Sequence, residues 1–141
     1  MHRSHSFAIA RKRRPDRREL GAALALTLLA TGVDEDATRA VACLEIAAGA
    51  DIGDALHALG ILARQGRGLP RNDVVAAQWM ARASAVGHIA GEIEYAIMLF
   101  NGTGVAKDET AAARHFLRAA HKGNPIAQNR IARLYQAGRG I

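Results

Sequence analysis

The chain contains a single cysteine, few aromatic residues and only three prolines. With Cys43 alone, an intrachain disulfide framework and a zinc site built from paired cysteines are both excluded. Aromatic side chains make up 4% of a composition that is 50% hydrophobic. The core must therefore consist mainly of Ala, Leu, Ile and Val, which suits closely packed helices better than a β-sandwich. A chain of 141 residues has room for one domain.

The formal net charge of +6 is unevenly distributed along the chain. Residues 1–18 carry seven basic side chains and one acid, whereas residues 19–141 are neutral overall. Within this neutral body, residues 19–54 hold seven acids and one arginine, and residues 110–141 hold six basic groups and no acid. The high isoelectric point therefore belongs to the N-terminal segment, and nucleic-acid binding by the body of the chain is not indicated.

Residues 1–17 are predicted to form a basic, disordered tail. Its cations and those directly after it are Arg11, Lys12, Arg13, Arg14, Arg17 and Arg18. Such a run is typical of a solvated leader, and the alternative is electrostatic contact with nucleic acid or an anionic membrane. Residues 11–33 also have the outline of a secretory signal, but no A-x-A cleavage site follows. We expect a cytoplasmic protein, with export as the alternative.

Residues of the same type recur at a spacing of 36 along the chain. The columns are Gly66, Gly102 and Gly138; Gly68, Gly104 and Gly140; Leu62, Met98 and Leu134; Met80 and Phe116; Ala83 and Ala119; and Gly87 and Gly123. One period back from Gly68, Leu62 and Met80 lie Gly32, Leu26 and Leu44. So many matches at one spacing indicate an internal structural repeat.

Each period predicts two helices joined by a glycine-containing turn. Apolar residues at helical spacing predict first helices over residues 20–30, 54–65, 89–100 and 127–137. Second helices are predicted over residues 37–48, 73–86 and 110–121. The expected side-chain caps at helix starts are Asp36, Asn72, Asp108 and Asn124, with Pro125 in the first position of the last helix.

This pattern resembles the Sel1-like repeat, a relative of the tetratricopeptide repeat, over about residues 18–141. The family's motif residues appear here as Ala55, Leu59–Gly60, Gly66, Gly68, Asn72, Ala76, Trp79–Met80, Ala83 and Gly87, and again as Gly102-Thr103-Gly104-Val105, Lys107-Asp108, His115-Phe116, Ala119-Ala120 and Gly123. Cys43 and His115 stand where the motif has Trp, which suggests looser packing. The resemblance implies an all-α, right-handed α/α solenoid of about three and a half 36-residue helical hairpins. The expected units are about 18–51, 52–87, 88–123 and the half unit 124–141.

The same resemblance implies that the first helices line an inner wall that binds a protein or peptide. The inward positions are Asp54, His57, Ile61, Arg64 and Gln65, then Ala90, Ile93, Ile97, Phe100 and Asn101, and finally Ile126, Asn129, Arg133 and Gln136. This strip has an apolar centre beside Arg64 and Arg133. Such a groove suits an extended or helical peptide with one hydrophobic anchor and an acidic group.

No catalytic motif stands out in the sequence. There is no Gly-x-Ser-x-Gly, P-loop or His-Glu-x-x-His, and Glu92 and Glu94 point apart on a helix, so they cannot form an acid–base pair. We expect an adaptor or scaffold without enzymatic activity, metal or cofactor. A β-lactam hydrolase is an alternative by family resemblance, against which the single cysteine argues. The acidic front and basic rear, together with a final helix that lacks its partner, also permit self-association.

Overall fold

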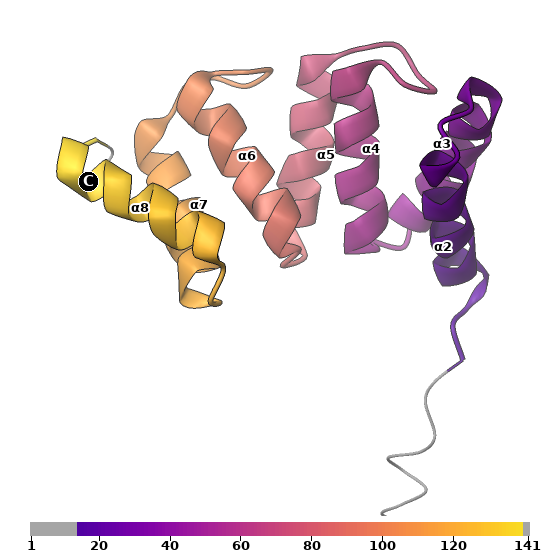
Figure 1. The fold of residues 1–141 in the computed structure, drawn as a ribbon, viewed down its shortest axis with the longest axis horizontal. Coiled ribbons are helices and arrows are strands. Elements are labelled where there is room, and N and C mark those ends of the chain that lie inside the picture. The colour runs from indigo at the N-terminus through magenta and orange to yellow at the C-terminus, as the bar shows by residue number, and fades with distance from the viewer. Residues whose placement is uncertain (1–13, 140–141) are drawn as a thin grey trace, which may run out of the picture.

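The computed structural model describes residues 14–139, which form seven helices and no strand (Figure 1). The helices are α2 (Arg17–Ala30), α3 (Asp34–Ala48), α4 (Gly53–Gln65), α5 (Asp73–Ala85), α6 (Ile89–Asn101), α7 (Glu109–His121) and α8 (Pro125–Ala137). Helices α2 and α3, α4 and α5, and α6 and α7 pack as hairpins, and α8 follows them. The predicted all-α hairpin solenoid is confirmed.

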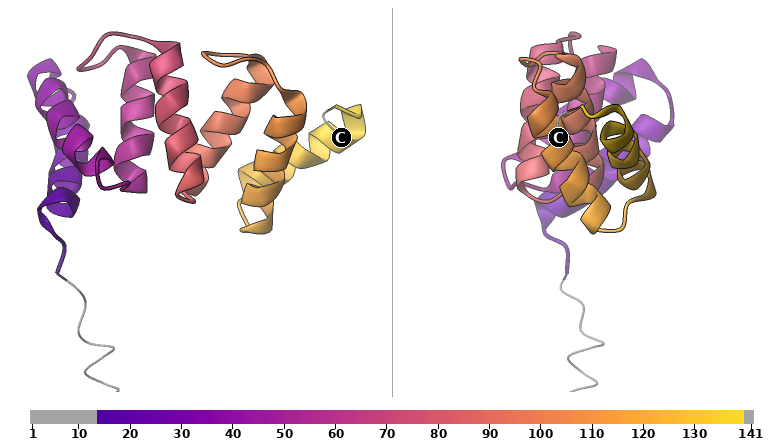
Figure 2. Two further views of the ribbon diagram at one scale, coloured as in Figure 1. Left: turned by 180° about the vertical axis from the view of Figure 1, so that it is seen from behind. Right: turned by 90° about the vertical axis from the view of Figure 1, so that its left-hand side faces the viewer.

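The hairpins follow one another along the long axis of the molecule (Figure 2). Each second helix packs on the first helix of the next hairpin, so that α3 contacts α4, α5 contacts α6 and α7 contacts α8. The first helices also touch one another, α2 with α4 and α4 with α6. The first helices therefore lie along one wall of the stack, as expected.

The helix ends follow the predicted caps in the second and third hairpins. The side chain of Asn72 accepts hydrogen bonds from two backbone N–H groups of α5, and Asp108 and Asn124 each accept one at the starts of α7 and α8. Gly66 and Gly102 end α4 and α6 in the left-handed conformation, with φ of 69° and 72°. A residue with a Cβ would be strained there, which explains why glycine recurs at this position.

Two further glycines hold the hairpins close together. A Cβ at Gly104 would lie 2.0 Å from the carbonyl oxygen of Asp73, and one at Gly68 would lie 2.7 Å from that of Ala37. The turn of each hairpin therefore rests directly on the start of the preceding hairpin's second helix. Arg139 pairs with Glu109 at the start of α7, so the fourth turn approaches the same place one repeat later.

Small residues also set the spacing of the helices themselves. A Cβ at Gly60 in α4 would lie 2.7 Å from the Met80 side chain of α5, and one at Gly91 in α6 would lie 2.5 Å from the Cβ of Ala83. Most of the buried core is alanine and leucine, as the composition predicts. Close packing of small side chains at this density leaves little room for larger substitutions.

The first hairpin differs from its predicted register. The turn between α2 and α3 spans only residues 31–33, whereas the equivalent turn of the second hairpin spans residues 66–72. The shorter turn shifts α2 relative to the 36-residue columns. The pairing of Leu26 with the buried Leu62 was therefore wrong, because Leu26 is 41% exposed while Ala25 faces the core.

The predicted cap and tail boundary also need correction in this hairpin. Asp36 does not cap α3, because the helix begins at Asp34 after Val33, and the Asp36 carboxylate instead accepts a hydrogen bond from the Thr31 hydroxyl. Helix α2 begins at Arg17, capped by the side chain of Asp16. Arg17 and Arg18 therefore belong to a helix and not to the tail. The predicted tail contacts Arg11, Lys12 and Arg13 lie outside the described residues, and Arg14 is exposed.

Within residues 14–139, none of the helices has both the length and the apolar character needed to cross a bilayer.

Replacement of Gly104 by Ala tests the close approach of the turn to the preceding hairpin. We expect Gly104→Ala to lower the free energy of unfolding in urea by ~2–5 kcal/mol, because left-handed strain adds to a clash with backbone. Gly123→Ala is the matched control, since Gly123 is also left-handed but nothing lies within 4 Å of its Cβ position. It should cost only ~1–2 kcal/mol. Equal losses for the two variants would show that the turn does not rest on α5.

Candidate functional site

The predicted inward positions lie on the exposed wall formed by α4, α6 and α8, which we call the inner groove. Ten of them are half-buried or exposed and face the solvent beside one another: His57, Ile61, Arg64, Gln65, Ile97, Phe100, Asn101, Asn129, Arg133 and Gln136. Asp54 is also exposed. Ile93 is an exception, because it is only 7% exposed and packs into the core between α6 and α7. It is therefore a core residue and does not contact a partner in the groove.

The middle of the inner groove is bridged by an ion pair between α4 and α6. The Arg64 guanidinium Nη1 lies 3.2 Å from Glu94 Oε2, and both side chains are about one-third exposed. Ile61, Arg64, Gln65 and Arg71 surround a hollow of about 290 Å³ at the end of α4. Arg64 was expected to meet an acidic group on a partner, but within the chain it already has a carboxylate.

Histidines join the starts of α4 and α6 in the same groove. His88 Nδ1 accepts a hydrogen bond from the Gly91 backbone N–H and caps α6, so Nε2 carries the proton and donates to Asp54 Oδ1 at 2.8 Å. The His57 ring lies against the His88 ring, with 4.9 Å between centroids. Burial and the charge of His88 lower the pKa of His57, while Glu94 and Asp54 oppose this shift.

A second hollow, of about 220 Å³, opens where the end of α6 meets α7 and α8; we call it the α6–α8 hollow. Its lining is Phe100, Phe116, Arg130, Arg133, Leu134, Ala137 and Arg139. Two aromatic rings and a leucine supply apolar surface, and three arginines surround it. Phe100 and Arg133, which the sequence places in different repeats, are thus brought to one site.

The three arginines of the α6–α8 hollow are not equivalent. Arg139 stacks on the Phe100 ring, with its guanidinium carbon 4.6 Å from the centroid, and it binds the Glu109 carboxylate through two nitrogens. This hydrogen bonding holds the pKa of Glu109 below its ordinary value. Arg130 and Arg133, both exposed, contact no carboxylate within residues 14–139. Two cations of this hollow are therefore unpaired.

Sequence reasoning missed Glu94, Arg130 and Arg139 as groove residues. Glu94 and Arg130 share one column of the 36-residue period with Ala58, which is buried. A charge at a position that is buried one repeat earlier is a signal that was readable in the sequence. Arg139 follows the last helix, and only the structure shows that it returns to Phe100.

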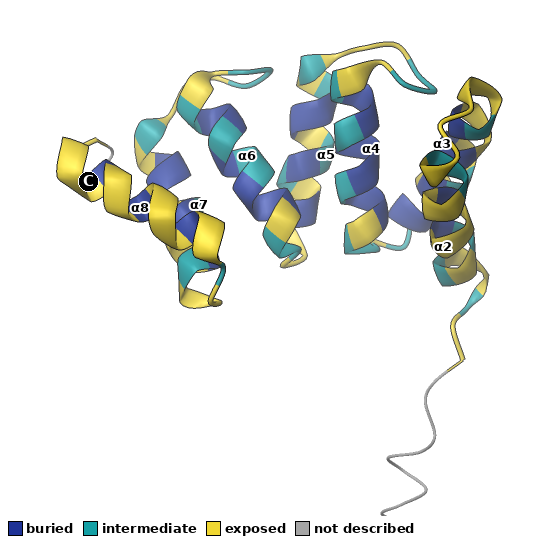
Figure 3. Ribbon diagram, viewed as in Figure 1, coloured by how far each residue is buried: buried dark blue, intermediate teal, exposed yellow. Residues whose placement is uncertain are grey.

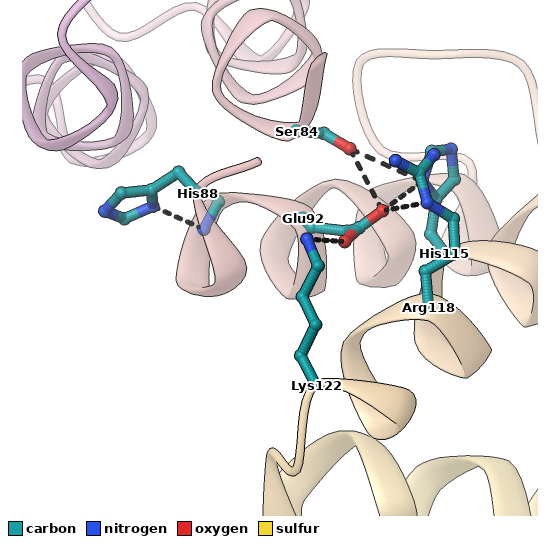
Figure 4. Close-up of polar contacts among 7 residues, drawn as sticks. Ser84, His88, Glu92, His115, Arg118 and Lys122 are labelled. Carbon is teal, nitrogen blue, oxygen red and sulfur yellow. Dashed lines mark hydrogen bonds and ion pairs between the residues drawn. The ribbon is translucent and has the colours of Figure 1, made fainter. Parts of the chain in front are cut away.

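A buried carboxylate joins α6 to α7 on the other side of α6 (Figure 4). Glu92 is 0% exposed, and His115 Nδ1 and Arg118 Nε lie 3.1 and 3.4 Å from its Oε2. Lys122 Nζ lies 3.7 Å from Oε1, which has no hydrogen-bond partner. One carboxylate thus gathers three basic groups from successive turns of α7. The equivalent residue of α4 is Leu56, which is fully buried.

The same cluster contains a serine, a histidine and a glutamate, but it does not have the geometry of a nucleophilic triad. Ser84 Oγ lies 3.4 Å from His115 Nδ1, the same nitrogen that contacts Glu92. A triad histidine uses one ring nitrogen for the acid and the other for the nucleophile. Ser84 is also only 2% exposed, so a substrate does not reach it in this conformation. The cluster connects helices.

Other candidate reactive groups are also accounted for by the structure. Cys43, which was expected to be buried, is half-buried beside Arg17, Arg18, Gly21 and Ile46. Glu92 and Glu94 point to different helices, as predicted. Among residues 14–139, no group of three or more His, Cys, Asp or Glu side chains has the arrangement of a metal site.

Comparison with known proteins matches the chain to the Sel1 repeat at residues 19–51, 53–88, 89–124 and 125–141. Similar solved structures include c5321, a protective antigen of uropathogenic Escherichia coli with an SLR fold (TM-score 0.82, 22% identity, 88% of this chain and 27% of that one). Others are a Sel1 repeat protein from Oxalobacter formigenes (0.79, 27%, 88% and 51%) and Helicobacter pylori cysteine-rich protein B (0.68, 21%, 78% and 83%). The chain thus spans about a quarter and a half of the first two. No curated protein matches it.

Replacement of Glu92 tests whether volume or charge holds α6 to α7. We expect Glu92→Leu, which copies position 56 of the preceding repeat, to change the free energy of unfolding by less than ~1 kcal/mol, because Arg118 and Lys122 are exposed enough to regain water. Glu92→Ala should cost ~2–4 kcal/mol by leaving a cavity. Urea unfolding measures both. If Glu92→Leu costs as much as Glu92→Ala, the ion pairs stabilise the hairpin.

The lowered pKa of His57 predicts a pH dependence of stability. Below its ordinary value of 6.5 the unfolded chain takes up a proton that the folded chain still refuses, so His57 favours unfolding as the pH falls through this window. Above 6.5 both states are neutral and the contribution vanishes. His57→Gln should therefore flatten the fall in unfolding free energy between pH 6.5 and acidic pH, while the exposed His121→Gln serves as control. A slope unchanged by His57→Gln contradicts this account.

Proposed function

Because the chain belongs to the Sel1 repeat family, whose members generally serve as protein-interaction scaffolds, we propose that it is an adaptor that binds a peptide segment of a partner protein in the inner groove. The partner segment carries one apolar side chain and a neighbouring carboxylate. The observation that carries this proposal is the α6–α8 hollow, where aromatic surface and unpaired arginines lie together.

The size of the α6–α8 hollow favours a single side chain as its occupant. Cavities that hold small-molecule ligands usually measure about 300–1,000 Å³, whereas this hollow measures about 220 Å³. Phe100, Phe116 and Leu134 offer apolar contacts to an inserted aromatic or leucine side chain. A few well-packed anchors of this kind supply most of the affinity of a peptide interface.

The charges of the groove favour an acidic residue beside that anchor. Arg130 and Arg133 lie at the hollow without a carboxylate, and a guanidinium binds a carboxylate through two parallel hydrogen bonds. At Arg64 a partner carboxylate would first have to displace Glu94. The acidic contact expected at Arg64 is therefore better placed at Arg130 and Arg133, one repeat further along the groove.

Selection of peptides on the purified protein tests this proposal. From a phage-displayed library of random 12-residue peptides, we expect enrichment of an aromatic or leucine residue next to Asp or Glu. Binding of a selected, fluorescein-labelled peptide should weaken at least tenfold in Arg130→Glu/Arg133→Glu, a loss of about 1.4 kcal/mol or more. Arg114→Glu, on the exposed face of α7, removes the same charge elsewhere and should leave the affinity unchanged.

Circular dichroism of all three proteins establishes that the helices remain folded. Selected peptides without acidic residues, or equal affinity for wild type and the double variant, would contradict recognition at this hollow.

A further inference from the structure

Helix α8 leaves one of its faces uncovered. Counting back by the 36-residue period, Gln128, Ala132 and Tyr135 correspond to Glu92, Ala96 and Leu99 of α6, and to Leu56, Gly60 and Ala63 of α4. All six equivalents are buried, whereas all three α8 residues are exposed, Tyr135 by 55%. Figure 3 shows the contrast between the mostly exposed α8 and the largely buried α4 and α6. We call Gln128, Ala132 and Tyr135 the α8 strip.

The structure shows what kind of element covers this face elsewhere. Gly60 of α4 lies against Met80 of α5, and Glu92 of α6 contacts three residues of α7. In both hairpins the cover is therefore a helix that packs lengthwise. The α8 strip has the small residue, Ala132, at the position where Gly60 receives the Met80 side chain. It is thus shaped to receive another helix.

The α8 strip is separate from the inner groove. At about 100° per residue, Ala132 lies roughly 100° around the helix from Arg133. Arg133 lines the α6–α8 hollow, and the α8 strip does not contribute to that hollow. A peptide in the groove therefore leaves the strip uncovered.

The opposite end of the stack also exposes apolar side chains, on what we call the α2 face: Leu20, Gly21, Leu24, Cys43 and Ile46. Leu20, Leu24 and Ile46 are 55%, 54% and 65% exposed, and Gly21, Cys43 and Ile46 border a hollow of about 580 Å³. Repeat proteins usually end in units with a polar outer face. This chain has apolar surface at both ends of its described residues.

We propose that a second copy of this chain covers the α8 strip with its α2 face, so that the copies associate head to tail. Charge selects this arrangement over a symmetric one. Residues 19–54 carry a net charge of −6, whereas residues 110–141 carry six basic side chains and no acid. Two α8 helices placed against each other would bring Arg130 and Arg133 of both copies together, but α2 and α3 bring acids to them.

The basic start of α2 lies too far away to cancel these acids. Asp34, Glu35 and Asp36 occupy the first turn of α3, at the end of the hairpin opposite Arg17 and Arg18 (Figure 1). The 14 residues of α2 span about 21 Å, which exceeds the Debye length of about 8 Å at physiological salt. The acidic first turn of α3 therefore presents its own charge to the basic end of another copy.

Sedimentation velocity with complementary variants tests the head-to-tail contact. Leu24→Lys blocks the α2 face and Tyr135→Glu blocks the α8 strip; both residues are exposed, so the fold should survive. We expect the wild type to form larger species as its concentration rises at low salt, and these should dissociate at about 0.5 M salt. Each variant alone should remain a monomer. An equimolar mixture should form dimers, because one variant keeps the strip and the other keeps the face.

Matched controls remove equally exposed apolar side chains outside the two surfaces. Val74→Lys on α5 and Ile126→Glu on α8 should associate like the wild type. A Leu24→Lys variant that still dimerises would indicate a symmetric α8–α8 contact and overturn the proposal. A wild type that stays monomeric at high concentration and low salt, or a mixture without dimers, would also overturn it. Peptide binding in the inner groove is unaffected by either result.

Discussion

The stack depends on the close approach of each turn to the backbone of the preceding hairpin. Gly104 meets the Asp73 carbonyl and Gly68 meets that of Ala37 at distances that admit no Cβ. These contacts fix how far each hairpin lies from its neighbour, and hence which faces of α4, α6 and α8 stay open. The inner groove is therefore a product of the contact between repeats, and no single hairpin could form it.

The 36-residue glycine and alanine columns were enough to predict the hairpins, their caps at Asn72 and Asp108, and most of the groove. The first hairpin was mispredicted because a short turn, residues 31–33, shifts the register of α2 without interrupting its apolar pattern. Ile93 was misplaced because helical spacing alone does not separate the groove from the adjoining core. Contacts such as Arg139 with Phe100 link distant residues, and no local pattern predicts them.

Two faces of one helix divide the proposed work of the chain. On one side of α8, unpaired arginines meet the aromatic end of α6, which supports recognition of an acidic peptide with an apolar anchor. On the other side, small and aromatic residues lie where the repeat places a covering helix in the earlier hairpins. Glu92 stands at the equivalent position of α6, where three basic groups of α7 close over it. The same repeat position thus serves cohesion within the chain and, at its end, contact between copies.

Hydrogen exchange of the backbone amides, followed by mass spectrometry in dilute protein, tests the central claim that each hairpin is stabilised by its neighbours. In a stack of this kind, helices with neighbours on both sides open least often. The account predicts the slowest exchange in α4 to α7 and faster exchange in α2 and α8. Protection of α8 equal to that of α6, or α4 and α5 exchanging as fast as the ends, would contradict it.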